Sequence, residues 1–192
     1  MRLVVADTSP LRYLLQIDQI GLLPRLFEKV LIPSVVRDEL THPSAPEAVR
    51  NWMTSPPGWI EVSVVSTSAD PSLSALDEGE RAAIALGLSL EAELILMDDR
   101  RGAAVARVKG FSVAGTLGIL DLAARRNMVD LADVLARMGS RGSGPQISAG
   151  GASFSMSCSG SMSDVAASEG SGRPIPESFP APLLEEYWAG KP

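Results

Sequence analysis

Acidic residues recur along this 192-residue chain at positions that suit a metal site. Asp7 directly follows a short apolar run, Asp98 and Asp99 follow another, and Glu39 and Glu80 lie between them in segments with a helical pattern. Two carboxylates about 4 Å apart repel by roughly 1 kcal/mol in water and by about 4 kcal/mol at the lower effective dielectric of a protein surface. If the fold brings these residues together, we expect a divalent cation to hold them.

The apolar pattern predicts the elements that must position these carboxylates. Strands that alternate with helices form parallel sheets with right-handed crossovers and helices on both faces. We therefore expect a three-layer α/β/α sandwich around a central, mostly parallel sheet. The expected strands are 3–6, 30–32, 60–64, 94–97 and 111–113. The expected helices are 10–17, 20–27 with Pro24 interrupting it, 33–40, 46–53, 77–86, 101–108, 117–124 and 131–138.

Asp7 and the pair Asp98 and Asp99 are expected at the same edge of that sheet, because each follows a strand. In open α/β sheets, ligands bind outside the carboxyl ends of the strands. Each of these residues also has a structural alternative. Asp7 can cap the helix that follows it, and one of Asp98 and Asp99 can cap the helix after them. Spacing alone does not separate Asp98 from Asp99.

The two glutamates have competing interpretations as well. Glu80 lies three residues after Asp77, which is the spacing of a capping box, and from spacing alone capping is the favoured role. Glu39 lies near the end of its expected helix. The helix dipole disfavours a negative charge there, and this favours a functional role for Glu39.

Other polar residues near the expected edge are candidates for substrate contacts. Thr116 can orient a ligand through its hydroxyl, although an N-cap role is favoured. A basic stretch beside the acidic pair suits phosphate contacts or, equally, a solvated helix face, and it comprises Arg100, Arg101, Arg107 and Lys109. His42 is the only histidine, has no recognisable Ser or Cys partner for a catalytic triad, and is expected at the surface.

Composition limits the class of protein. The net charge of −6, from 17 Lys and Arg against 23 Asp and Glu, argues against coating nucleic acid by bulk electrostatics, so any such contact must be local. The single cysteine excludes an intramolecular disulfide, and Met1 leads into a strand rather than a secretory signal. No apolar run approaches the 18 or so residues of a membrane span. We expect a soluble, cytoplasmic protein.

The organisation of the chain changes near residue 139. We expect one domain over 1–138, a flexible Gly/Ser-rich linker over 139–173, and a short C-terminal segment over 174–192. That last segment contains enough apolar residues to dock on the body or on a partner, among them Leu183, Leu184, Tyr187 and Trp188.

Five motifs in order carry a resemblance to a known family. They are VADTSPL at 5–11, IPSVVRDEL at 32–40, LDEGERAAIAL at 76–86, LMDDRR at 96–101 and GTLG at 115–118. With these motifs, the chain over about residues 2–138 resembles PIN-domain proteins, and more narrowly the subfamily DUF3368. The resemblance implies a Mg²⁺- or Mn²⁺-dependent ribonuclease, often the toxin of a type II toxin–antitoxin pair. A small antitoxin protein and a homodimer are the expected partners.

The resemblance also implies roles for particular residues. The acidic positions of the family are matched by Asp7, Glu39, Glu80 and Asp99, with Asp98 as the alternative to Asp99, and Ser9 matches a small polar residue beside the metal. Arg100 or Arg101 is expected to hold a phosphate of single-stranded or looped RNA next to the cleaved bond.

Two other classes of function compete with this one. A PIN-like module that binds RNA or a partner without cleaving it would have lost an acidic position, and all are filled here. A phosphatase of the haloacid dehalogenase type would carry Asp where Ser9 stands, and a nucleotide triphosphatase would need a Gly-rich phosphate loop, which the sequence lacks. A metal-dependent nuclease is therefore the leading hypothesis.

Overall fold

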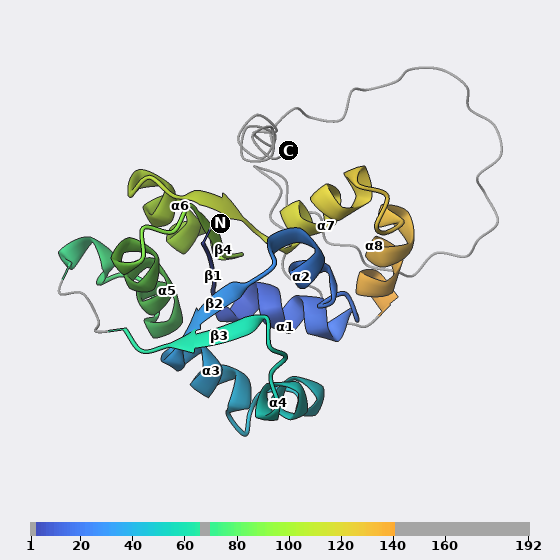
Figure 1. Ribbon diagram of the computed structural model, residues 1–192, viewed down its shortest axis with the longest axis horizontal. Coiled ribbons are helices and arrows are strands. Elements are labelled where there is room, and N and C mark those ends of the chain that lie inside the picture. The colour runs from blue at the N-terminus through green and yellow to red at the C-terminus, as the bar shows by residue number, and fades with distance from the viewer. Residues whose placement is uncertain (1–2, 66–69, 141–192) are drawn as a thin grey trace, which may run out of the picture. The chain divides into compact units, whose positions relative to one another are not determined.

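The computed structural model describes residues 3–65 and 70–140, which contain a five-stranded parallel sheet (Figure 1). The strands lie in the order β3-β2-β1-β4-β5, and every pairing between described strands is parallel. Their bounds are β1 Val4–Ala6, β2 Val30–Pro33, β3 Ile60–Ser63, β4 Leu94–Leu96 and β5 Ser112–Ala114. In the centre of the sheet, Ala6 pairs with Leu96, so the residues after these two strands meet at one edge.

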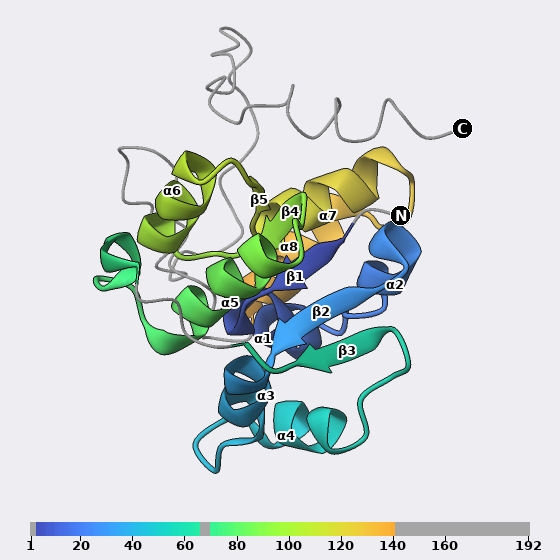
Figure 2. The same ribbon diagram turned by 60° about the vertical axis from the view of Figure 1, so that its left-hand side comes forward.

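Helices cover both faces of the sheet, which gives the three-layer α/β/α sandwich expected from the sequence (Figures 1 and 2). In Figure 1, α5 and α6 lie to the left of the strands, and α1 and α7 lie to the right. The helices are α1 Thr8–Gln16, α2 Leu22–Phe27, α3 Ser34–Thr41, α4 Glu47–Thr54, α5 Glu78–Ser89, α6 Arg100–Val108, α7 Thr116–Arg125 and α8 Leu131–Ser140, with a 3-10 turn, η1, at Pro71–Leu73.

The three central strands, β2, β1 and β4, are buried on both sides because they are apolar at every position. Successive side chains of a strand point to opposite faces. Val5 and Ile95 therefore join the cluster under α5 that contains Ile84 and Leu86, while their neighbours face the other helix layer. All three residues of β1 and all three of β4 are buried. Such continuous apolar runs are typical of parallel sheets with both faces covered.

The expected elements are all present, with shifted boundaries. Pro24 does not interrupt α2, because it lies in the first turn, where a backbone N–H has no partner within the helix and its loss costs nothing. Val64 was expected in the third strand, but β3 ends at Ser63 and Val64 is 89% exposed. Apart from 139 and 140, which end α8, the expected linker and C-terminal segment lie outside the described residues. In the described part of the chain, no helix is long and apolar enough to cross a membrane.

Close packing of α5 against the sheet depends on Gly87. A Cβ on Gly87 would lie 3.1 Å from the ring of Phe111 and 3.2 Å from Cδ1 of Ile95, closer than side chains normally pack. The absence of a side chain at this position lets α5 approach β4. The first turn of the same helix carries Gly79 and Glu80 at the carboxyl edge of the sheet.

Replacing Gly87 by Ala should therefore destabilise the protein, with Gly118→Ala as the matched control. Ala favours a helix over Gly by about 1 kcal/mol at both positions. At Gly118 the nearest atom to an added Cβ is 3.8 Å away, so we expect a net gain in stability. At Gly87 overpacking costs about 1–3 kcal/mol and outweighs the gain. Urea denaturation measures the free energy of unfolding of both variants. A Gly87→Ala variant as stable as Gly118→Ala would contradict the packing argument.

Candidate functional site

Asp7 lies at the centre of the carboxyl edge and is nearly fully buried. Its backbone N–H donates to the carbonyl of Leu96 at 2.9 Å, which fixes it between β1 and β4. Asp7 is the residue before α1, but its side chain makes no capping hydrogen bond. It is 4% exposed, and burial raises its pKa to about 7, with the nearby N–H of Thr8 opposing the rise and the charge of Glu39 adding to it. A helix cap does not require such burial, so capping alone does not explain this carboxylate.

Glu39 reaches the same edge from α3. Its Oε2 accepts a hydrogen bond from the hydroxyl of Thr8, the residue after Asp7. Partial burial of the carboxylate raises the pKa of Glu39, and the Thr8 hydrogen bond opposes that shift. Thr8 therefore holds the carboxylate of Glu39 beside Asp7.

The carboxylates of Asp7 and Glu39 face a common space at Gly79. A Cβ built on Gly79 would lie 3.0 Å from Oε1 of Glu39 and 3.2 Å from Oδ1 of Asp7. Any side chain at this position would enter the space between the two carboxylates. Carboxylate oxygens are the ligands that Mg²⁺ and Mn²⁺ prefer. The donor set and the space at Gly79 therefore fit a divalent cation held by Asp7 and Glu39.

Glu80 both caps α5 and faces the site. Its N–H donates to Oδ1 of Asp77 at 2.8 Å while its Oε2 accepts from the N–H of Asp77 at 3.3 Å, which completes the capping box. The other oxygen, Oε1, would lie 3.3 Å from a Cβ on Gly102. Glu80 is 6% exposed, and burial raises its pKa to about 7, with the charges of Asp77, Asp99 and Asp7 adding to the rise. Its place in the capping box is therefore compatible with its candidate role in the acidic site.

Asp98 and Asp99 point to different neighbours. Asp99 caps α6, since its Oδ1 accepts from the N–H groups of Arg101 at 2.7 Å and Gly102 at 2.9 Å. Its burial acts to raise its pKa, but these donors and a hydrogen bond with Glu80 outweigh burial and lower it. Asp98 instead accepts from the N–H and the hydroxyl of Thr116, at 2.7 and 2.6 Å, and burial raises its pKa.

The favoured sequence interpretation of Thr116 as an N-cap is wrong. The residue before α7 is Gly115, whose backbone is extended, and Thr116 begins the helix. Thr116 is 1% exposed and uses its hydroxyl to orient Asp98. A Cβ on Gly115 would lie only 2.7 Å from Oδ1 of Asp98, so the turn leaves room for that carboxylate.

The acidic residues come together as two pairs rather than as one preformed cluster. Asp7 meets Glu39 at Gly79, and Glu80 meets Asp99 at Gly102. Within residues 3–65 and 70–140, no three His, Cys, Asp or Glu side chains lie close enough to hold a metal ion. The full convergence expected from the sequence is not seen there. Mutual repulsion of the carboxylates favours such a separation when no cation balances them.

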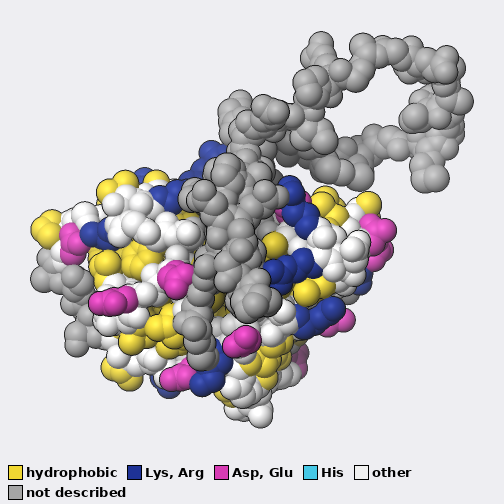
Figure 3. All heavy atoms as spheres, turned by 45° about the horizontal axis from the view of Figure 1, so that its top comes forward, with side chains coloured by type: hydrophobic (Ala, Val, Ile, Leu, Met, Phe, Trp, Pro, Cys, Tyr) yellow, Lys and Arg dark blue, Asp and Glu magenta, His cyan; other side chains and the backbone are white. Residues whose placement is uncertain are grey.

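Only the first residues of the basic stretch flank the site. Arg100 and Arg101 begin α6 beside Asp99, and the Arg101 guanidinium donates to the carbonyl of Ala75 at 3.3 Å. Lys109, at the other end of α6, pairs with Asp70 at 2.5 Å. On the described part of the face in Figure 3, basic and acidic side chains are interspersed. Of the four residues in the basic stretch, Arg100 and Arg101 are the ones that lie beside the acidic edge.

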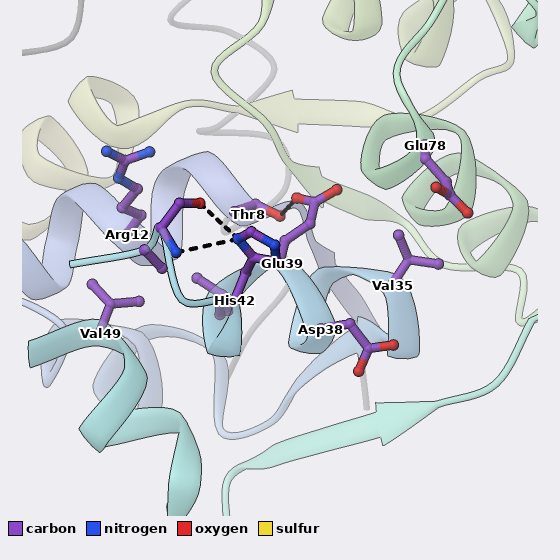
Figure 4. Close-up of a pocket in the computed structure, with 11 residues that line it drawn as sticks. Thr8, Arg12, Val35, Asp38, Glu39, His42, Val49 and Glu78 are labelled. Atoms are coloured by element: carbon purple, nitrogen blue, oxygen red, sulfur yellow. Dashed lines mark hydrogen bonds between the residues drawn. The ribbon is translucent and has the colours of Figure 1, made fainter. Parts of the chain in front are cut away.

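A pocket of about 480 Å³ adjoins the acidic edge and was not predicted from the sequence (Figure 4). It shares Thr8 and Glu39 with that edge, and its other lining residues are Arg12, Val35, Asp38, Leu40, His42, Ser44, Ala45, Val49 and Glu78. His42 is exposed, as expected, and its Nδ1 lies 2.7 Å from Oγ of Ser44, two residues along the chain. The packing of α1 against α3 and α4 brings these residues together, and no motif indicates it.

The raised pKa values of Asp7 and Glu80 predict that the metal-free protein loses stability as pH rises. Between about pH 4 and pH 7 the folded state keeps protons on these carboxyls that the unfolded chain has released, so folding becomes less favourable across that window. In EDTA, the Tm of the wild type should fall by roughly 5 °C relative to Asp7→Asn between about pH 5 and pH 8. Thermal unfolding followed by circular dichroism measures this difference.

Addition of Mg²⁺ or Mn²⁺ at about pH 8 should restore most of the lost stability in the wild type and little in Asp7→Asn, because binding to the folded state stabilises it. If the Tm difference between the two proteins stayed constant with pH, the pKa of Asp7 would not be raised by burial in the folded state, and this prediction would be wrong.

Comparison with known proteins agrees with the fold. The family model DUF3368, described as a PIN domain, matches residues 3–143, which is most of the chain. A search of curated proteins found no match. PIN domains are generally nucleases and typically use divalent metal ions. The chain belongs to the PIN-domain family, in its DUF3368 group.

Proposed function

We propose that this protein is a Mg²⁺- or Mn²⁺-dependent endoribonuclease that hydrolyses phosphodiester bonds in single-stranded or looped RNA. The observation that carries the proposal is the placement of Asp7 and Glu39 around the space at Gly79, at the carboxyl edge of a PIN-type sheet. No Lys or Arg forms an ion pair with either carboxylate among the described residues. Their charge is available for a cation.

Each acidic residue has a distinct part in the proposed reaction. Asp7 and Glu39 would hold the cation, and the Thr8 hydroxyl keeps Glu39 turned toward Asp7. When bound, the cation supplies an activated water and stabilises charge on the phosphate. Glu80 and Asp99 extend the acidic edge toward α6. There Arg100 and Arg101 are placed to contact a phosphate beside the cleaved bond.

Asp98 forms a third acidic position, on the α7 side of the edge. Two hydrogen bonds from Thr116 hold its carboxylate, and its surroundings raise its pKa by burial. Ser9 lies in the first turn of α1, next to Asp7, where its N–H favours the charged form of that carboxylate. In this proposal, Asp98 and Ser9 contribute to the charge state of the acidic edge.

Charge favours single-stranded RNA as the substrate. Duplex binding uses many phosphate contacts along an extended basic surface. Here the net charge is −6, and the basic residues next to the acidic edge are few. A short, unpaired strand needs only local contacts and can present one phosphate to the carboxylates. Growth inhibition as a type II toxin, neutralised by a small antitoxin protein, and a homodimeric state are the biological setting that we propose for this activity.

The test of the proposed function is Asp7→Asn, with Asp121→Asn as the matched control. Asp121 lies on α7 and pairs with Arg125 at 2.8 Å on the surface, so its replacement leaves the acidic edge intact. Asp7→Asn keeps the shape of the side chain but removes the charge that binds the cation. We expect at least a hundredfold loss of Mn²⁺-dependent cleavage of single-stranded RNA, equivalent to about 2.7 kcal/mol, together with loss of growth inhibition on expression.

The controls separate the possible results of this test. Asp121→Asn should cleave at the wild-type rate, and the metal-free Asp7→Asn protein should be at least as stable as the wild type. Cleavage by Asp7→Asn with unchanged metal dependence would remove Asp7 from the site. A wild type that binds RNA but never cleaves it would instead support a non-catalytic PIN-like module.

A further inference from the structure

The pocket beside Glu39 is continuous with the proposed cleavage site. Thr8 and Glu39 line the pocket and also form the acidic edge. A strand whose phosphate lies at the carboxylates must therefore place a neighbouring nucleotide at the pocket mouth. The volume of about 480 Å³ falls within the usual range of small-ligand sites and suits a single nucleotide.

The hydrogen bonds of His42 determine which group it offers to the pocket. Its Nδ1 lies 3.2 Å from the backbone N–H of Ser44, which can only donate, so Nδ1 must accept. The neutral ring then carries its proton on Nε2. The contacts with Ser44 therefore leave the Nε2–H group of His42 as a hydrogen-bond donor. This group can donate to a carbonyl oxygen or a ring nitrogen on the edge of a base.

Arg12 supplies the positive charge of this pocket. Among the described residues that line the pocket, Arg12 is the only Lys or Arg. It is exposed and lies one helical turn after Thr8 on α1 (Figure 4). No ion pair of Arg12 is found in the described part of the chain. The charge of Asp38 at the rim is offset by Arg37, whose guanidinium lies 2.6 Å from it. Arg12 is therefore available for a phosphate.

The pocket also has an apolar wall. It is formed by side chains from α3, from α4 and from the turn between them, namely Val35, Leu40, Ala45 and Val49. An unpaired base has apolar faces and a polar edge, and proteins that bind single strands contact both. The wall suits the face of a base, and the donor of His42 suits its edge.

We propose that this pocket binds the nucleotide next to the cleaved bond, with Arg12 contacting its phosphate and His42 reading the edge of its base. The proposal rests on the proposed function and adds base selectivity to it. It predicts that the protein prefers some bases over others at the nucleotide next to the cleaved bond. His42, rather than the acidic edge, should determine this preference.

The test measures RNA binding in the Asp7→Asn background, where no cleavage is needed. Fluorescence anisotropy with a short labelled RNA of mixed sequence compares Arg12→Ala with Arg25→Ala, an exposed arginine on α2 that does not line the pocket. A charge-assisted hydrogen bond contributes about 1.5 kcal/mol, so Arg12→Ala should weaken binding about tenfold. Arg25→Ala should change it less than twofold. Equal affinities for the two variants would overturn the phosphate contact.

Base reading is tested with oligo(A), oligo(C) and oligo(U) in the same background. His42→Ala should reduce the spread of affinities among the three, and His42→Gln, which keeps a side-chain donor, should restore part of it. An unchanged spread in His42→Ala would overturn the base contact and leave the pocket to a different class of ligand, such as a partner peptide. Because these measurements need no catalysis, a failure of the nuclease proposal would appear separately, as absent cleavage by the wild type.

Discussion

The repulsion among carboxylates at the carboxyl edge of the sheet is the constraint on which the rest of the site depends. The parallel pairing of β1 with β4 brings Asp7 to the same edge as Asp98 and Asp99, and the fold buries Asp7 there. Burial raises the pKa values of Asp7 and Glu80 to about 7, so charging them costs folding free energy. Groups with such perturbed pKa values cluster at functional sites, and here a bound cation would remove the unfavourable free energy of charging the buried carboxylates.

Three glycines and two threonines make this arrangement sterically feasible. Gly79, Gly102 and Gly115 each lie where a Cβ would contact a carboxylate, so their absence of a side chain leaves room for the acidic groups. Thr8 and Thr116 each donate a hydroxyl to one carboxylate, Glu39 and Asp98 respectively. The glycines leave the space and the threonines orient the carboxylates. Within residues 3–65 and 70–140, no Lys or Arg forms an ion pair with the Asp7 and Glu39 pair at Gly79.

The fold, and the placement of Asp7, Asp98 and Asp99 at one edge of the sheet, were predictable because they follow from local patterns. Apolar runs such as Leu94–Leu96 leave little choice but a buried strand, and a carboxylate directly after such a run must lie at the edge. Glu80 was ambiguous because a capping box and a site residue have the same spacing, and the structure forms the capping box while also burying the Glu80 carboxylate at the acidic edge. The Thr116 contact with Asp98 and the pocket of Arg12 and His42 join residues distant in sequence, so they depend on packing that no local pattern encodes.

The central claim is that Asp7 and Glu39 together hold a divalent cation in the space at Gly79. A crystal of the full chain grown with Mn²⁺ and measured at the manganese absorption edge tests it most directly, because anomalous scattering locates the ion without assumptions about its ligands. The account predicts an anomalous peak within direct coordination distance of both carboxylates. A peak that contacts neither of them, or no peak at this edge in a crystal saturated with Mn²⁺, would contradict it.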